Sequence, residues 1–208
     1  MVKRQADIQT IETAERILRA AREVFVKKGI DGARLHEIAA LSGTSQGLII
    51  YHFRNKDKLY QLVMLEELSV FFRMNVPILS DRSTSLERKI ELMVERYFAM
   101  ADMGPHLSMF ILNEMLKGHS GLKNQIKKQR NMLNRSVMAD QLREAIKVGK
   151  YRNINFSEVL INIIGLTIFP IIAAPVMQTA GGISEEEYHR KLFDRRKRVY
   201  EWVLVMMR

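Results

Sequence analysis

The chain has 208 residues, of which 47% are hydrophobic and 27% charged, and this balance excludes a disordered or fibrous protein. Cysteine is absent from the sequence, which excludes disulfides and thiolate metal sites and fits a reducing cytosol. The formal net charge of +10 indicates an anionic partner, although most of the excess lies in residues 117–152 and near the C-terminal end. The first ten residues contain Lys3, Arg4 and Asp7 and no apolar core, so we expect no signal peptide.

Hydrophobic periodicity predicts an all-α fold of about nine helices, because no segment keeps the two-residue period of a strand for long. The first expected helix covers residues 11–28 and stops at Gly29. Two short helices then meet at Gly43, which favours a left-handed end to the first of them. Ser45 is the expected N-cap of the second, which continues through Ile49 to Phe53.

Longer helices are expected in the rest of the chain. Asn55 is expected to cap a helix that continues to about Val76, ends before Pro77 and links the N-terminal helices to the larger C-terminal part. The remaining helices are expected over residues 86–103, after a capping box at Thr84–Glu87, over residues 105–117 and 120–149, and after start signals at Asn155 and Ser184.

The short helix that begins after Ser45 has an outward face with little charge. Ile49 and Phe53 lie one turn apart, so we expect both to be buried. A face that only contacts solvent would carry more charge, so this pattern favours contact with a partner. The outward side chains are Gly47 and Tyr51, flanked by Leu48 and Ile50, with Gln46 and His52 at the margins.

Two helices joined by a glycine turn, the second with polar and methyl-bearing groups outward, indicate a helix-turn-helix DNA reader. The segment resembles the N-terminal domain of the TetR family of bacterial transcriptional regulators. Two departures from the family pattern are Leu48 in place of Thr and Ile50 in place of Tyr, and Arg34 stands where a capping Ser or Thr is usual. The residues that carry the resemblance are Ile38, Ala39, Gly43, Ser45, Gly47, Tyr51, His52, Phe53, Lys56 and Leu59.

The resemblance implies a cytoplasmic, homodimeric regulator, most often a repressor, that binds double-stranded DNA and responds to a small-molecule effector. A DNA-binding domain is expected over residues 1–56, and a ligand-binding and dimerisation domain over residues 57–208. The last two helices would form the dimer interface. A two-fold protein reads a palindromic operator, with half-sites centred about 34–36 Å apart or a multiple of that. No cofactor or metal is implied, and the sequence does not identify the effector.

The family pattern also assigns residues to both expected sites. Gln46, Gly47, Leu48, Ile50 and Tyr51 would face the major groove, where the aliphatic pair meets thymine methyls. Arg34, Ser45, His52 and Lys56 would bind phosphates, and His36 completes the DNA-binding set. The residues expected around the effector are Phe71, Tyr97, Met100, His106, Phe110, Asn113, Met138 and Phe169.

Two other classes of protein remain open from the sequence. Residues 43–47 match the G-x-S-x-G pattern of hydrolases with Ser45 as nucleophile, but no strand is expected before it. His36 and Glu37 begin a zinc-binding H-E-x-x-H pattern, which Ala40 interrupts, so no metal site is expected. Residues 159–177 are almost continuously apolar, which permits either a helix buried in an oligomer or the membrane span of an anchored regulator.

Overall fold

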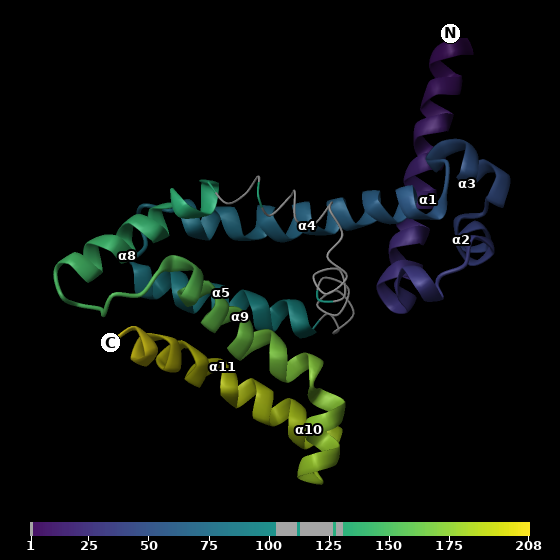
Figure 1. Cartoon of the computed structure of the whole chain (residues 1–208). Helices are drawn as coiled ribbons and strands as arrows, with labels where there is room; N and C mark the ends of the chain where they lie inside the picture. The colour runs from purple at the N-terminus through teal and green to yellow at the C-terminus, as the bar shows by residue number, and fades with distance from the viewer. Residues whose placement is uncertain (1, 103–111, 113–126, 128–130) are drawn as a thin grey trace. The chain divides into compact units, whose positions relative to one another are not determined.

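The computed structural model describes residues 2–102, 112, 127 and 131–208, and within these residues every regular element is a helix (Figure 1). The predicted all-α fold is therefore confirmed. The chain divides into two compact units between Val70 and Phe71. The helix expected over residues 105–117 and the first part of the one expected over residues 120–149 lie outside the described residues.

The first unit contains α1 (Val2–Gly32), α2 (Leu35–Ser42), α3 (Gln46–Phe53) and the beginning of α4 (Lys56–Ser80). The α1 helix begins well before residue 11, and its regular part stops at Gly29, where φ is 66° and ψ is 179°. Ile17, Phe25, Ile38, Ile49 and Leu59 are buried, and together they form the core that fixes the orientation of α3.

The α4 helix continues through Pro77 to Ser80, so the prediction that it ends at about Val76 was wrong. Pro77 has no N–H to donate to the preceding turn, which normally destabilises a helix. Here its carbonyl accepts the N–H of Asp81 at 3.1 Å. Ile78 and Leu79 are buried in the core of the second unit, and this packing outweighs the lost hydrogen bond.

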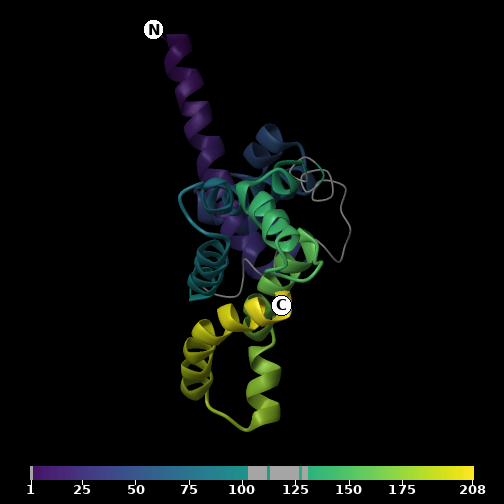
Figure 2. The ribbon, with the colours of Figure 1, turned by 90° about the vertical axis from the view of Figure 1, so that its left-hand side faces the viewer.

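The second unit contains the rest of α4 together with α5 (Leu86–Asp102), α8 (Val137–Lys147), α9 (Phe156–Ile172), α10 (Ala174–Gly181) and α11 (Glu185–Met207). The α5 helix packs against α8, α9 and α11. In both views, α9 and α11 run side by side and are joined through α10 (Figures 1 and 2). The core they share is rich in methionine and aromatic side chains.

Side-chain caps begin these helices, mostly as predicted. Asn55 Oδ1 accepts the N–H of Lys58 at 2.8 Å, and Asn155 and Ser184 cap α9 and α11 in the same way. The expected capping box from Thr84 was wrong by one residue, because Ser85 Oγ caps α5 by accepting the N–H of Arg88. Thr84 is used differently: its carbonyl and its hydroxyl oxygen accept from the buried Lys89 ammonium at 2.6 and 2.9 Å.

Two expected helices are interrupted. The helix expected through residue 149 has a break at Ser136, whose hydroxyl donates to Leu133 O and accepts from Ala139 N to begin α8. The apolar run over residues 159–177 is broken at Ala173 into α9 and α10. No single helix in the described part of the chain is long and apolar enough to cross a bilayer; only this pair, bent by 66°, meets the criteria of length and composition.

Candidate nucleic-acid interface

The turn between α2 and α3 is fixed by short-range hydrogen bonds. Gly43 ends α2 in the left-handed conformation, with φ 63° and ψ 35°, as predicted. The N–H of Thr44 reaches Ala39 O at 2.9 Å, and the hydroxyls of Ser42 and Thr44 are 2.8 Å apart. Ser45 Oγ then accepts the N–H of Leu48 at 3.1 Å, which caps α3. Because the turn is bonded at each step, α3 leaves it in one defined direction.

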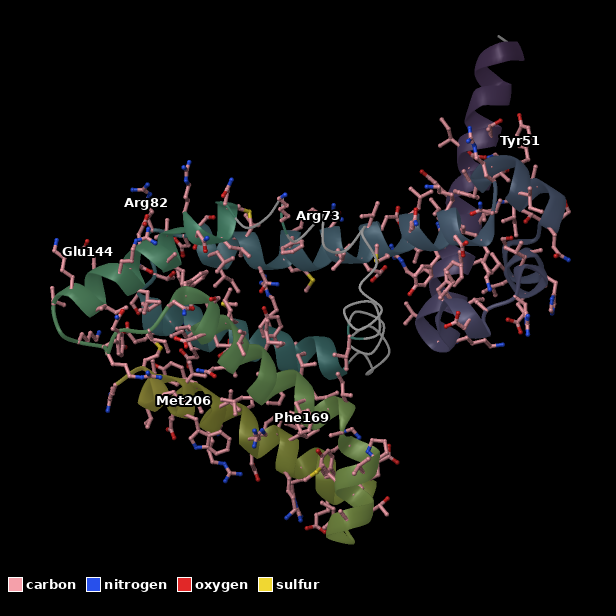
Figure 3. The ribbon with its side chains drawn as sticks, in the orientation of Figure 1. Tyr51, Arg73, Arg82, Glu144, Phe169 and Met206 are labelled. Atoms are coloured by element: carbon pink, nitrogen blue, oxygen red, sulfur yellow. The ribbon has the colours of Figure 1, made fainter. Side chains whose placement is uncertain are left out.

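The α3 helix has the two faces that its sequence predicts. Ile49 and Phe53 are buried at 1% and 7% exposure, whereas Tyr51 is 78% exposed on the outer side of the helix (Figure 3). Leu48 and Ile50 are 37% and 48% exposed, and Gln46 and Gly47 also contact solvent. The fold therefore presents an exposed surface of two aliphatic side chains, an amide and a phenol.

Gly47 lies on this surface without any structural need for glycine. A Cβ at this position would meet only Ser45 Oγ within 4 Å, at 3.8 Å, which is an ordinary contact. Glycine inside a helix is destabilising relative to alanine. The packing of the described residues therefore does not account for glycine at this position.

Lys56 is held inside the first unit. Its ammonium donates to Ile30 O at 2.8 Å and to Ala33 O at 3.2 Å, so it joins the start of α4 to the connection between α1 and α2. These carbonyls explain how a cation is accommodated in the first turn of a helix, where the helix dipole disfavours positive charge. A lysine has three N–H donors, so one is left for another acceptor.

Glu37 supports the start of α2 near two candidate residues, Arg34 and His36. Its carboxylate accepts the Lys28 ammonium at 2.6 Å and the backbone N–H of Arg34 at 3.3 Å. The hydrogen bond from Lys28 is the main reason that the pKa of Glu37 is lowered. The Arg34 side chain makes no capping hydrogen bond, and both Arg34 and His36 are exposed.

His52 and Arg54 lie at the C-terminal end of α3. His52 is half-buried, with its ring edge-on to Tyr51 at 5.4 Å between centroids. Arg54 is exposed and is the C-cap residue, with φ 69°. The sequence-based prediction did not include Arg54. A signal was present, because a single residue separates the buried Phe53 from the helix-capping Asn55, and a reversal that short needs an unusual backbone angle.

The residues expected around an effector are not all brought together. Tyr97 and Met138 are buried in the core of the second unit. Phe169 is 65% exposed on α9, so the structure does not include it in that core. The side chains of Phe71 and Met100 lie outside the described residues, as do His106, Phe110 and Asn113.

Ser45 lacks the surroundings of a hydrolase nucleophile. The element before it is the α2 helix instead of a strand, and its hydroxyl caps α3. Within the described residues, no group of three or more histidine and carboxylate side chains is arranged to hold a metal ion.

Comparisons with known proteins agree with this geometry. Residues 17–63 match the family model for bacterial regulatory proteins of the tetR family. A segment of 61 residues is 36% identical to the HTH-type transcriptional repressor BepR of Brucella suis biovar 1 (strain 1330), and covers 29% of each chain. A 145-residue alignment with the HTH-type transcriptional repressor KstR2 of Mycolicibacterium smegmatis is 23% identical and covers 69% of this chain and 70% of KstR2. The BepR alignment thus spans under a third of that relative.

Solved structures share the fold over nearly the whole chain. A Clostridium perfringens putative fatty acid metabolism regulator has a TM-score of 0.65 at 17% identity, covering 91% of this chain and 96% of its own. The transcriptional regulator FadR from Bacillus subtilis, in complex with stearoyl-CoA, has a TM-score of 0.62 at 19% identity, covering 91% and 97%. At these identities the likeness shows the fold alone.

Proposed function

Because the chain belongs to the TetR family of bacterial regulatory proteins, we propose that it is a transcriptional repressor whose DNA binding responds to a small-molecule effector. It acts on DNA in the cytoplasm. The first 56 residues supply DNA recognition, and residues 57–208 supply effector binding and dimerisation. The observation that carries the proposal is the exposed, nearly uncharged face of α3 above the buried Ile49 and Phe53.

The α3 helix enters the major groove of the operator. Gln46 hydrogen-bonds a base edge, Leu48 and Ile50 contact thymine methyls, and Gly47 lets the backbone approach the bases closely. Tyr51 is exposed enough to reach the groove beside them. Arg34, His36, Ser45 and His52 contact the sugar-phosphate backbone, which positions the protein without reading sequence. Lys56 contributes at most one donor there, because its other hydrogen bonds are internal.

Dimerisation occurs through α9 and α11. Val159, Ile163 and Ile171 of α9 are buried against the chain's own core, whereas Ile161 and Phe169 are 66% and 65% exposed on the same helix. Val205 and Met206 of α11 are also exposed, and Figure 3 marks Phe169 and Met206 within this set. Exposed apolar side chains on two helices that pack together mark an interaction site. The partner is a second copy of this chain, and the two-fold symmetry of the pair requires an operator with inverted half-sites.

The effector is an apolar molecule that binds within the second unit. Its core contains Met93, Tyr97, Phe98 and Met138, and methionine-rich linings adapt to varied apolar ligands. One solved structure similar to this chain holds stearoyl-CoA, a ligand with a long apolar chain. The effector releases DNA by binding better to a conformation in which α4 is tilted and α3 is displaced. We therefore assign Phe169 to dimerisation and keep Tyr97 and Met138 for the effector.

Selection of bound fragments from random duplex DNA tests the proposal. The expected product is an inverted repeat that binds a protein dimer. Gln46→Ala should change the preferred base at one position in each half-site, by about 1–3 kcal/mol of discrimination per base pair. Repeating the measurement with a panel of apolar metabolites should identify compounds that lower operator affinity. A strictly monomeric protein, or one without preference for any inverted repeat, would contradict the proposal.

A further inference from the structure

The end of α3 is a one-residue reversal centred on Arg54. Its φ and ψ are 69° and −50°, and Asn55 N–H donates across it to Phe53 O at 2.9 Å. A hydrogen bond from residue i+2 back to residue i around a residue with positive φ is a γ-turn of the rare, strained kind. In addition, the N–H of Arg54 donates to Ile50 O at 2.7 Å, which keeps the turn attached to α3.

Arginine is an unfavourable residue for this backbone conformation. Residues with a Cβ are disfavoured at positive φ, whereas glycine adopts such angles readily. Arg54 is the one residue other than glycine with positive φ in the described part of the chain. The fold alone would therefore favour glycine at residue 54, and a strained residue beside a binding surface indicates a functional requirement for its side chain.

The Arg54 guanidinium has no hydrogen-bond or ion-pair partner within the described residues, and the residue is exposed. Most neighbouring cations of the first unit differ in this respect. Arg22, Lys27 and Lys28 bind glutamates, Lys56 binds two backbone carbonyls, and Lys58 donates to Gln61 Oε1. The charge of Arg54 is thus available to an external anion.

The position of Arg54 brings it near DNA when α3 reads bases. The α3 helix has eight residues, and at 1.5 Å per residue it is about 12 Å long, close to the roughly 12 Å width of the major groove. A helix of this length with its first turn on the bases brings its last turn within reach of a bordering strand. Arginine is long, always charged, and binds phosphate oxygens through a fork of donors.

We propose that Arg54 is a phosphate-binding residue, held by the γ-turn between α3 and α4 so that its guanidinium clamps the DNA backbone bordering the groove. This role rests on the proposed DNA-binding function and adds a contact that the family pattern does not assign. Arg54 would bind the phosphate that the family pattern assigns to Lys56. The Lys56 ammonium is poorly placed for this contact because it is hydrogen-bonded inside the first unit.

Arg54→Gly distinguishes a structural role of Arg54 from a phosphate contact, because the substitution should raise the stability of the fold and lower the affinity for DNA. The variant should unfold at a higher urea concentration than the wild type, since glycine relieves the turn. Its affinity for both the selected operator and random duplex should fall, on the order of 10- to 60-fold at 0.1 M salt. A dimer loses two phosphate contacts, so the slope of log K against log salt should decrease in magnitude by about 1.8.

Three further variants control the measurement. Arg54→Asn removes the charge without introducing glycine, and should reproduce the loss of affinity and slope. Arg54→Lys should retain the slope. Lys147→Gln removes one charge from an exposed position of α8 in the second unit and should leave binding unchanged.

An unaltered salt slope in Arg54→Gly and Arg54→Asn would overturn the inference. An equal loss of DNA affinity and salt slope in Lys147→Gln would overturn it too. Because random duplex reports the phosphate contact by itself, this result does not depend on operator preference. Absence of any preferred inverted repeat for the wild-type protein would instead count against the proposed function.

Discussion

Two exposed apolar surfaces of this chain, one on α3 and one on α9, differ in their surroundings. On α3, Leu48 and Ile50 alternate with Gln46 and Tyr51, and cationic residues lie close by in sequence. On α9, Ile161 and Phe169 belong to a run without any charged residue from residue 159 to residue 184. Base edges offer methyl groups among hydrogen-bonding atoms, whereas a protein interface core is depleted of charge. The residues around an exposed aliphatic side chain therefore indicate its binding partner better than its exposed fraction does.

The largest expected effect tests the α9 surface. Ile161→Glu places a carboxylate on an apolar face, and the two-fold axis would introduce it twice. Burying a charge without a partner costs several kcal/mol, so dimerisation should weaken by about a thousandfold or more, and operator binding should fall with it. Sedimentation velocity and operator titration measure both quantities.

Val148→Glu is the matched control, because Val148 is an aliphatic residue of the second unit with 75% exposure outside α9. It should leave the dimer intact. If Ile161→Glu remains a dimer with normal operator affinity, the α9 surface is not the dimer interface.

A smaller effect concerns the Lys56 hydrogen bonds that join the start of α4 to the connection between α1 and α2. Lys56→Met removes the hydrogen bonds to Ile30 O and Ala33 O, and bonds made by charged groups contribute about 1.5–3 kcal/mol each. Urea unfolding should show a loss of at least one such bond's contribution, about 1.5–3 kcal/mol, while the salt slope of DNA binding stays close to that of the wild type. Lys58→Met, which loses one bond to Gln61, should cost under about 0.5 kcal/mol, as expected for a surface position. A lower slope with unchanged stability in Lys56→Met would restore the phosphate role expected from the sequence.

Apart from the control variants, the smallest expected change in stability is that of a substitution on the α3 surface. Gly47→Ala should stabilise the fold by about 0.5–1 kcal/mol, because alanine favours a helix and the added Cβ has room. The same methyl should weaken operator binding, since in the proposed complex it would stand where the backbone approaches the bases. A more stable protein with undiminished operator affinity would mean that the helix does not approach the groove at Gly47.

Local rules predicted much of the first unit. The spacing of Ile49 and Phe53 gave the buried face of α3, and Gly43, Ser45 and Asn55 marked helix ends that the structure confirms. These features depend on residues three or four positions apart, so a single sequence contains the information.

The missed features depend on distant contacts or on alternatives of nearly equal energy. The acceptors of Lys56 lie 26 and 23 residues away, and the burial of Ile78 and Leu79, which carries α4 past Pro77, is a tertiary effect. Thr84 and Ser85 are equivalent caps by composition; in the structure Ser85 caps α5, whereas the Thr84 hydroxyl accepts from Lys89.

The continuity of α4 limits how the protein can be shortened. A fragment that stops at residue 56 would lack Leu59, Tyr60 and Val63, which are buried in the intact chain. The Tyr60 ring meets Phe25 edge-on at 5.0 Å between centroids, so its removal would open the interior of the N-terminal piece to water. A fragment intended to keep these contacts should therefore extend to about residue 70, where α4 passes from the first unit to the second.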